Sequence, residues 1–120
     1  MGWFGRVCGL YQRSVMTWDR EMNLRLTVRK RDTSIVVHVG GDIDIASIFD
    51  LHDFLLLMAE GRSSLTVNLS DVGFMDSTGI FGLMRARAAV RDRGHELVFE
   101  EPSERVAHLL DVIGLTLNTV

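Results

Sequence analysis

The sequence predicts a single α/β domain with a mostly parallel sheet, whose elements follow one another in the order β-β-α-β-α-β-α-β. Two observations predict this class. Short runs of alternating or continuous apolar residues, typical of strands, are separated by longer stretches with apolar residues at helical spacing. The chain has 120 residues, of which 47% are hydrophobic and 24% charged, a balance typical of one globular domain.

The first two strands are predicted at residues 24–28 and 35–39. In the first of them apolar and polar residues alternate, which is the period of a strand with one buried face. The polar stretch 31–34 is short, so the two strands are expected to pair as an antiparallel hairpin, with the first at the edge of the sheet. Gly40 and Gly41 are expected to interrupt the second strand.

The rest of the chain is interpreted as helices that alternate with strands. Helices are predicted at residues 47–58, about 78–93 and about 103–113, and strands at residues 65–69, 96–100 and 115–117. Ser47 is expected to cap the first of these helices with its hydroxyl. This alternation implies parallel strand pairs joined by right-handed crossovers. The composition changes near residue 22, so we predict a disordered N-terminal extension at residues 1–22 and one domain at residues 23–120.

Charge is distributed unevenly along the chain. Residues 1–31 carry a net charge of +5 and residues 32–120 a net charge of −8. The acidic body argues against nucleic-acid binding, which depends on neutralising phosphates. No apolar run approaches the ~20 residues of a membrane-spanning helix. A single cysteine, Cys8, cannot form an internal disulfide, which fits a reducing compartment. We therefore expect a cytoplasmic protein with neither nucleic acid nor membrane as a partner.

The most informative segment is residues 70–80, between a predicted strand and the helix that follows it. Loops at this end of an open parallel sheet commonly carry function. Ser77 is expected at or just before the helix start, where its simplest role is to cap the helix. A phosphate on Ser77 would instead meet free backbone N–H groups, and would bring about −1.5 to −2 charges beside Asp76. Both interpretations, helix cap and phosphorylation site, are open at this point.

Two other residues of this segment, and a pair of aspartates outside it, each allow two interpretations. Asp76 could orient a hydroxyl for phosphoryl transfer, or it could serve as a capping carboxylate. Gly79 allows a close approach of the backbone, or is simply tolerated in a first helical turn. Asp42 and Asp44 follow a strand on the same side of the sheet, where turn formation is favoured over metal binding.

The sequence lacks the common motifs for metal binding, phosphate binding and nucleophilic catalysis. The histidines lack metal-ligand spacing, no phosphate-binding loop is present, and no nucleophile has a visible base and orienting group. We therefore expect neither an enzyme nor a cofactor. One helix carries four arginines that are predicted to form a solvated face: Arg85, Arg87, Arg91 and Arg93.

Three segments, residues 41–44, 67–80 and 113–115, resemble the bacterial anti-sigma-factor antagonists, which are single STAS domains. The resemblance covers about residues 24–118. It implies a STAS-like fold and a cytoplasmic protein without catalysis of its own. In that family the serine that matches Ser77 is phosphorylated by an anti-sigma factor that is also an ATP-dependent serine kinase. The unphosphorylated form binds the anti-sigma factor and frees the sigma factor, phosphorylation blocks the binding, and a phosphatase reverses it.

The resemblance also implies a docking surface around the phosphorylated serine. Its residues are Asp42, Asp44, Asp76, Ser77, Thr78, Gly79 and Phe81. Phe81 stands where family members usually have a small residue, so its ring either alters which kinase fits or packs into the core. The oligomeric state is left open.

Two other functions are compatible with the same residues. A STAS subunit of a larger assembly, such as a stress-signalling complex or a lipid transport system, would not need Ser77 as a switch. A small-ligand sensor would require a pocket among the loops at the sheet end.

Overall fold

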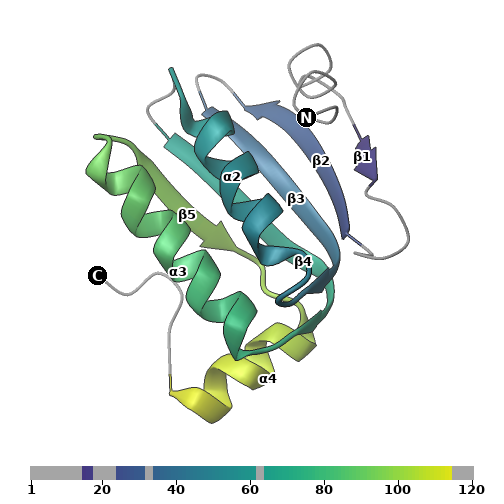
Figure 1. Ribbon diagram of the computed structural model, residues 1–120. Helices are drawn as coiled ribbons and strands as arrows, with labels where there is room; N and C mark the ends of the chain where they lie inside the picture. The colour runs from purple at the N-terminus through teal and green to yellow at the C-terminus, as the bar shows by residue number, and fades with distance from the viewer. Residues whose placement is uncertain (1–14, 18–23, 32–33, 62–63, 115–120) are drawn as a thin grey trace.

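The computed structural model describes residues 15–17, 24–31, 34–61 and 64–114. They form a five-stranded sheet in the order β1-β2-β3-β4-β5, with helices packed on it (Figure 1). The elements are β1 (Val15–Thr17), β2 (Leu24–Arg31), β3 (Ser34–Ile43), α2 (Ile48–Ala59), β4 (Ser64–Met75), α3 (Ser77–Asp92), β5 (Glu96–Glu100) and α4 (Glu104–Ile113).

The sheet is mixed, as predicted. Strand β2 pairs antiparallel with β3, and β3, β4 and β5 pair in parallel. The predicted fold class and hairpin are thus confirmed, whereas the predicted strand at 115–117 lies outside the described residues. One difference concerns the edge: β1 pairs antiparallel with the outer side of β2, so β2 is not the edge strand. Strand β1 falls within residues 1–22, which were predicted to be a disordered extension, and the rest of that segment is not described.

Strands β3 and β4 are longer than predicted. Strand β3 continues through Gly40 and Gly41 to Ile43, with irregular register on either side of the glycines, and β4 continues to Met75. The glycines therefore do not end the strand, because parallel pairing with β4 carries both strands onward. A β-carbon on Gly40 would crowd the Arg25 guanidinium, whose Cζ would lie 3.0 Å away.

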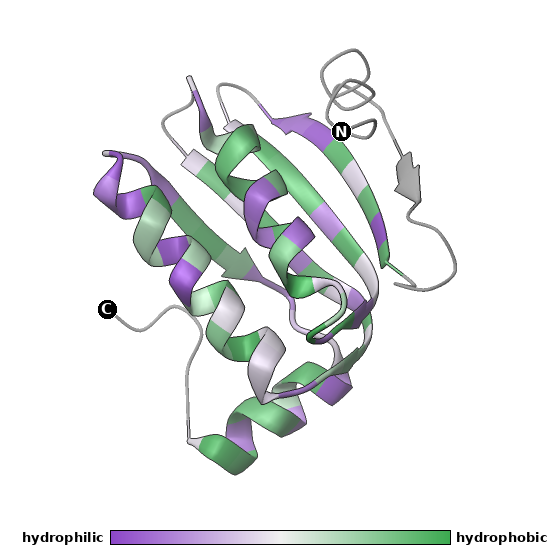
Figure 2. Cartoon of the chain, in the orientation of Figure 1, coloured by the Kyte–Doolittle hydropathy of each residue, from purple (hydrophilic) through white to green (hydrophobic). Residues whose placement is uncertain are grey.

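Helices α2 and α3 lie side by side over one face of the sheet (Figure 1). Each buries one stripe of apolar residues against the strands; in α2 these include Ile48, Leu51, Leu55 and Met58. Green, hydrophobic residues run along the strands beneath the helices, while the helices alternate green and purple (Figure 2). The two helices approach closely at Gly82, where a β-carbon would overlap the Ile48 side chain.

Helix α4 is fastened to β4 by its capping residue. The Ser103 hydroxyl accepts a hydrogen bond from the Val106 amide at 3.3 Å and donates one to the Val72 carbonyl at 2.7 Å. Gly114 ends the helix in a left-handed conformation, with φ of 73°. Helix α4 therefore lies at the end of the sheet where β4 leads into α3 (Figure 1). Among the helices described, none has the length and apolar character needed to span a membrane.

Candidate functional site

The parallel pairing of β3 with β4 brings two functional loops together. Ile43 and Met75, the last residues of the two strands, are partners in the sheet. One residue further on, the Asp76 amide donates a hydrogen bond to the Ile43 carbonyl at 3.4 Å. The loop that carries Asp44 therefore lies beside the loop that leads into Ser77, as the sequence predicted for this end of the sheet.

The loop after β3 is held by Ser47, which is fully buried. Its hydroxyl donates to the Asp42 carbonyl at 2.9 Å and accepts from the Asp44 amide at 3.2 Å. The Asp44 side chain accepts in turn from the Ala46 amide at 3.0 Å. Ser47 stands at the N-cap position of α2 but makes no side-chain capping bond, so its predicted capping role is wrong. Its hydroxyl instead fixes the loop that presents Asp44. Both aspartates were expected to follow the strand, but Asp42 lies within β3.

The cap of α3 is Asp76, not Ser77. The Asp76 Oδ1 accepts a hydrogen bond from the Gly79 amide at 2.9 Å, which satisfies one of the unpaired N–H groups of the helix start. Ser77 is the first residue of the helix proper. The interpretation of Ser77 as the capping residue is therefore wrong, and the capping interpretation of Asp76 is confirmed.

The Ser77 side chain is exposed, and its hydroxyl makes no hydrogen bond to any residue in the described part of the chain. Thr78, next to it, is also exposed. Because the backbone N–H groups of a first helical turn lack partners within the helix, the N–H groups at this end favour a negative group. A hydroxyl at this place is open to an enzyme and is located where a phosphate is electrostatically tolerated.

Gly79 is required by the close contact between α3 and β3. A β-carbon at this position would collide with the Ile43 carbonyl oxygen and would lie 2.9 Å from the Ile43 Cγ2. The obstacle is backbone, which cannot rotate aside as a side chain can. Of the two predicted alternatives for this glycine, the structure supports close backbone approach.

Large apolar side chains are exposed around this end of the molecule. They come from the loop after β3, from α2, from the end of β4 and from α3: Ile45, Phe49, Phe74 and Phe81. Phe81 is 56% exposed, so the alternative that its ring packs into the core is wrong. Exposed apolar residues that gather beside polar groups are typical of protein contact surfaces.

Two hollows are lined by residues close to Ser77 in the sequence. One, of about 330 Å³, is lined on the α3 side by Thr78 and Gly82 among others. The second, of about 450 Å³, lies between the end of β4, at Phe74 and Met75, and the face of α4. Sequence reasoning missed these hollows because their walls come from elements far apart in the chain. Phe49 was the available signal, since it lies off the apolar stripe that α2 buries.

The four arginines in and directly after α3 do not form one solvated face. Arg87 is buried, whereas Arg85, Arg91 and Arg93 are exposed. Burial lowers the pKa of Arg87, the charge of Arg91 lowers it further, and Glu96 acts in the opposite direction. Only three of the four predicted positions are therefore solvated. Within the described ranges, no three His, Cys, Asp or Glu side chains are grouped so as to hold a metal ion.

The family described as "Mlab, STAS domain" matches residues 26–117 of this chain. The chain belongs to the STAS-domain family. This STAS domain is 35% identical over 94 residues to the anti-sigma-B factor antagonist of Bacillus subtilis (strain 168). The aligned region covers 78% of this chain and 86% of that protein. It is 32% identical over 95 residues to the anti-sigma-B factor antagonist of Staphylococcus aureus (strain NCTC 8325 / PS 47). That alignment covers 78% of this chain and 88% of the relative.

Solved structures agree on the fold. An anti-sigma factor antagonist from Mycobacterium paratuberculosis superposes with a TM-score of 0.61 at 19% identity, over 82% of this chain and 83% of that one. The anti-sigma factor antagonist SpoIIAA in its unphosphorylated form superposes with a TM-score of 0.60 at 16% identity, over 75% of this chain and 81% of that one. These two likenesses establish the STAS fold of the chain.

Proposed function

We propose that this STAS domain is an anti-sigma-factor antagonist of the bacterial cytoplasm, switched by phosphorylation of Ser77. In the unphosphorylated state it binds an anti-sigma factor that is also a serine kinase, and a sigma factor is released. Phosphorylation of Ser77 ends this binding, and a phosphatase restores it. The domain itself has no catalytic activity, and ATP is bound by the kinase. The observation that carries the proposal is the Ser77 hydroxyl at the first position of α3, which is exposed and makes no hydrogen bond to the described residues. The chain that carries it is a relative of anti-sigma-B factor antagonists.

The kinase must reach the Ser77 hydroxyl without unfolding the chain. Ser77 is exposed and its loop is fastened by the Asp76 cap and by the bond from the Asp76 amide to Ile43. A fixed backbone limits the positions that the hydroxyl can take, which lowers the entropic cost of placing it in line with a phosphoryl group. Asp76 and Gly79 act here as positioning residues for Ser77.

Phosphorylation acts on the partner by charge. A phosphate adds about −1.5 to −2 charges at pH 7. On Ser77 it would stand next to the Asp76 carboxylate and near Asp42 and Asp44, at a surface that also exposes large apolar side chains and that docks the kinase under this proposal. A dianion buried against a partner must be paired or it costs binding energy. Thr78 and Phe81 lie next to the serine on the same surface and belong to the proposed contact.

A second candidate is a permanent subunit of a larger assembly, such as a stress-signalling complex or a lipid transport system. The exposed aromatic residues Phe49, Phe74 and Phe81 favour it, because a constant interface also needs apolar anchors. In that case Ser77 would stay unmodified, and the protein would co-purify stably with its partners.

The test is phosphosite mapping by mass spectrometry on the protein isolated from its native cells, under growth and stress conditions, with Ser77→Ala as the control. Phosphate on Ser77 that is absent from the control supports the switch. A Ser77 that remains unmodified in every condition, together with stable co-purification, transfers support to the assembly subunit.

A further inference from the structure

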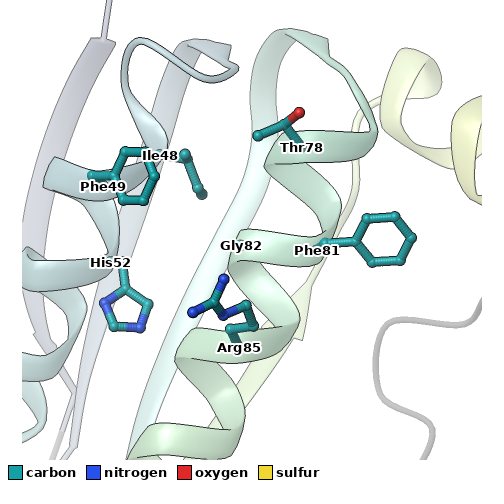
Figure 3. A pocket seen from close by; sticks show the side chains of 7 residues that line it. All are labelled: Ile48, Phe49, His52, Thr78, Phe81, Gly82 and Arg85. Carbon is teal, nitrogen blue, oxygen red and sulfur yellow. The ribbon is translucent and has the colours of Figure 1, made fainter.

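A groove between α2 and α3 begins beside the phosphorylation site. It has a volume of about 330 Å³ and is lined by residues of both helices: Ile48, Phe49 and His52 from α2, and Thr78, Phe81, Gly82 and Arg85 from α3 (Figure 3). We call it the α2–α3 groove. Thr78 directly follows Ser77, so a protein that reaches the Ser77 hydroxyl from this side also covers the groove.

One part of the groove is apolar. The Ile48 side chain points toward α3 at Gly82, where the two helices are closest (Figure 3). The Phe49 ring lies at the rim, is 68% exposed and is not among the residues that α2 buries in the core. Phe81, by contrast, directs its ring away from α2 (Figure 3). The apolar part of the groove therefore suits one bulky aliphatic or aromatic side chain.

The other part of the groove is positively charged. Arg85 is exposed, forms no ion pair with any described residue, and points across the groove toward His52 (Figure 3). No acidic residue occurs in α3 between Ser77 and Arg91. His52 has a carboxylate of its own nearby, since its Nδ1 lies 3.7 Å from the Asp53 Oδ1. An unpaired arginine at an apolar surface of an otherwise acidic domain is complementary to a carboxylate.

We propose that the α2–α3 groove receives a segment of the partner kinase that carries a bulky apolar side chain next to a carboxylate, and that this contact determines which kinase the domain recognises. The apolar side chain packs on Ile48, Phe49 and the backbone at Gly82, and the carboxylate pairs with Arg85. The inference rests on the proposed function and deepens it: Ser77 reports the phosphorylation state, whereas Phe49 and Arg85 select the partner.

The experiment measures binding of purified, unphosphorylated protein to each purified anti-sigma-factor kinase of the cells that make it, by isothermal titration calorimetry. Variants are Phe49→Ala and Arg85→Glu, both at exposed positions. The matched control is Arg93→Glu, which makes the same change of charge at an exposed position at the far end of α3. We expect Phe49→Ala and Arg85→Glu to weaken binding at least tenfold and Arg93→Glu less than twofold. Replacing the partner's carboxylate by lysine should restore at least part of the affinity of Arg85→Glu.

The possible failures are distinguishable. If no kinase binds the unphosphorylated wild type, the proposed function itself is wrong. If a kinase binds the wild type and both groove variants with equal affinity, the function stands and the groove inference is overturned. It is also overturned if Phe49→Ala turns a dimer into a monomer in analytical ultracentrifugation while kinase binding is unchanged, because the occupant is then a second copy of the chain.

Discussion

The β-carbon that Gly79 lacks would be placed against the carbonyl oxygen of Ile43, 2.9 Å from the Cγ2 of the same residue. The same carbonyl accepts the hydrogen bond from the Asp76 amide. The end of β3 thus contacts the start of α3 on both sides of Ser77, and the position of the serine depends on this one carbonyl group.

Gly79→Ala should therefore destabilise the protein and displace Ser77. We expect a loss of about 1–3 kcal/mol in the free energy of unfolding, because backbone must move to admit the methyl group. Chemical denaturation monitored by circular dichroism measures the loss. The control is Gly73→Ala, where the nearest atom, the Gly41 carbonyl oxygen, lies at an ordinary 3.9 Å. An equal effect of the two substitutions would contradict the assigned contact.

Asp76 and Ser77 should differ in their effect on stability. Asp76→Ala removes the side chain that caps α3, at a cost of about 0.5–2 kcal/mol, while Asp76→Asn keeps a capping oxygen and most of the stability. Ser77→Ala should change the free energy of unfolding by less than about 0.5 kcal/mol, because the Ser77 hydroxyl makes no hydrogen bond to any residue that the structure describes. Thermal and urea unfolding of the three variants decide the assignment. A Ser77→Ala protein as unstable as Asp76→Ala would show that the serine is the cap after all.

Charge at Ser77 should weaken kinase binding. We expect Ser77→Asp to raise the dissociation constant about tenfold, equivalent to ~1.4 kcal/mol, and Ser77→Ala to bind whether or not the kinase has ATP. Ser34→Asp, at the start of β3 and away from the proposed surface, is a control for the added charge and should bind as the wild type does. Calorimetric titration with the kinase measures all three. Wild-type affinity of Ser77→Asp would remove the electrostatic part of the proposed switch.

Ser103 should stabilise the α4 side of the site. Its hydroxyl bonds both the Val106 amide and the Val72 carbonyl, so Ser103→Ala should cost about 1–3 kcal/mol. Ser103→Thr retains a hydroxyl in the same position and serves as the control. Hydrogen exchange followed by mass spectrometry should show faster exchange in α4 for the alanine variant, and unchanged exchange there would argue against this anchoring role.

Much of the fold could be predicted because its signals are local. Apolar alternation marked β2, helical spacing of apolar residues marked α2, and the helix predicted at about 103–113 agrees with α4. The extent of β3 and β4 could not be predicted from such signals. Gly40 and Gly41 are typical of a strand end, but hydrogen bonding between two strands that are distant in sequence overrides that local preference.

The capping residue of α3 was predictable to within one residue. Aspartate and serine are almost equally good caps, so adjacent Asp76 and Ser77 cannot be ranked from sequence, and only the bond from the Gly79 amide distinguishes them. The α2–α3 groove was not predictable, because Phe49 and Arg85 come from different helices and their proximity depends on how closely Gly82 lets those helices approach.

The attachment of the Ser77 loop to the Ile43 carbonyl has a consequence for timing. A loop joined to the sheet by backbone contacts has little freedom to adopt a second shape, so under the proposed function the two states differ in charge and share one conformation. No slow structural relaxation then separates modification from response. The delay between a stress and the release of the sigma factor would be set by the turnover of the kinase and phosphatase and by partner dissociation.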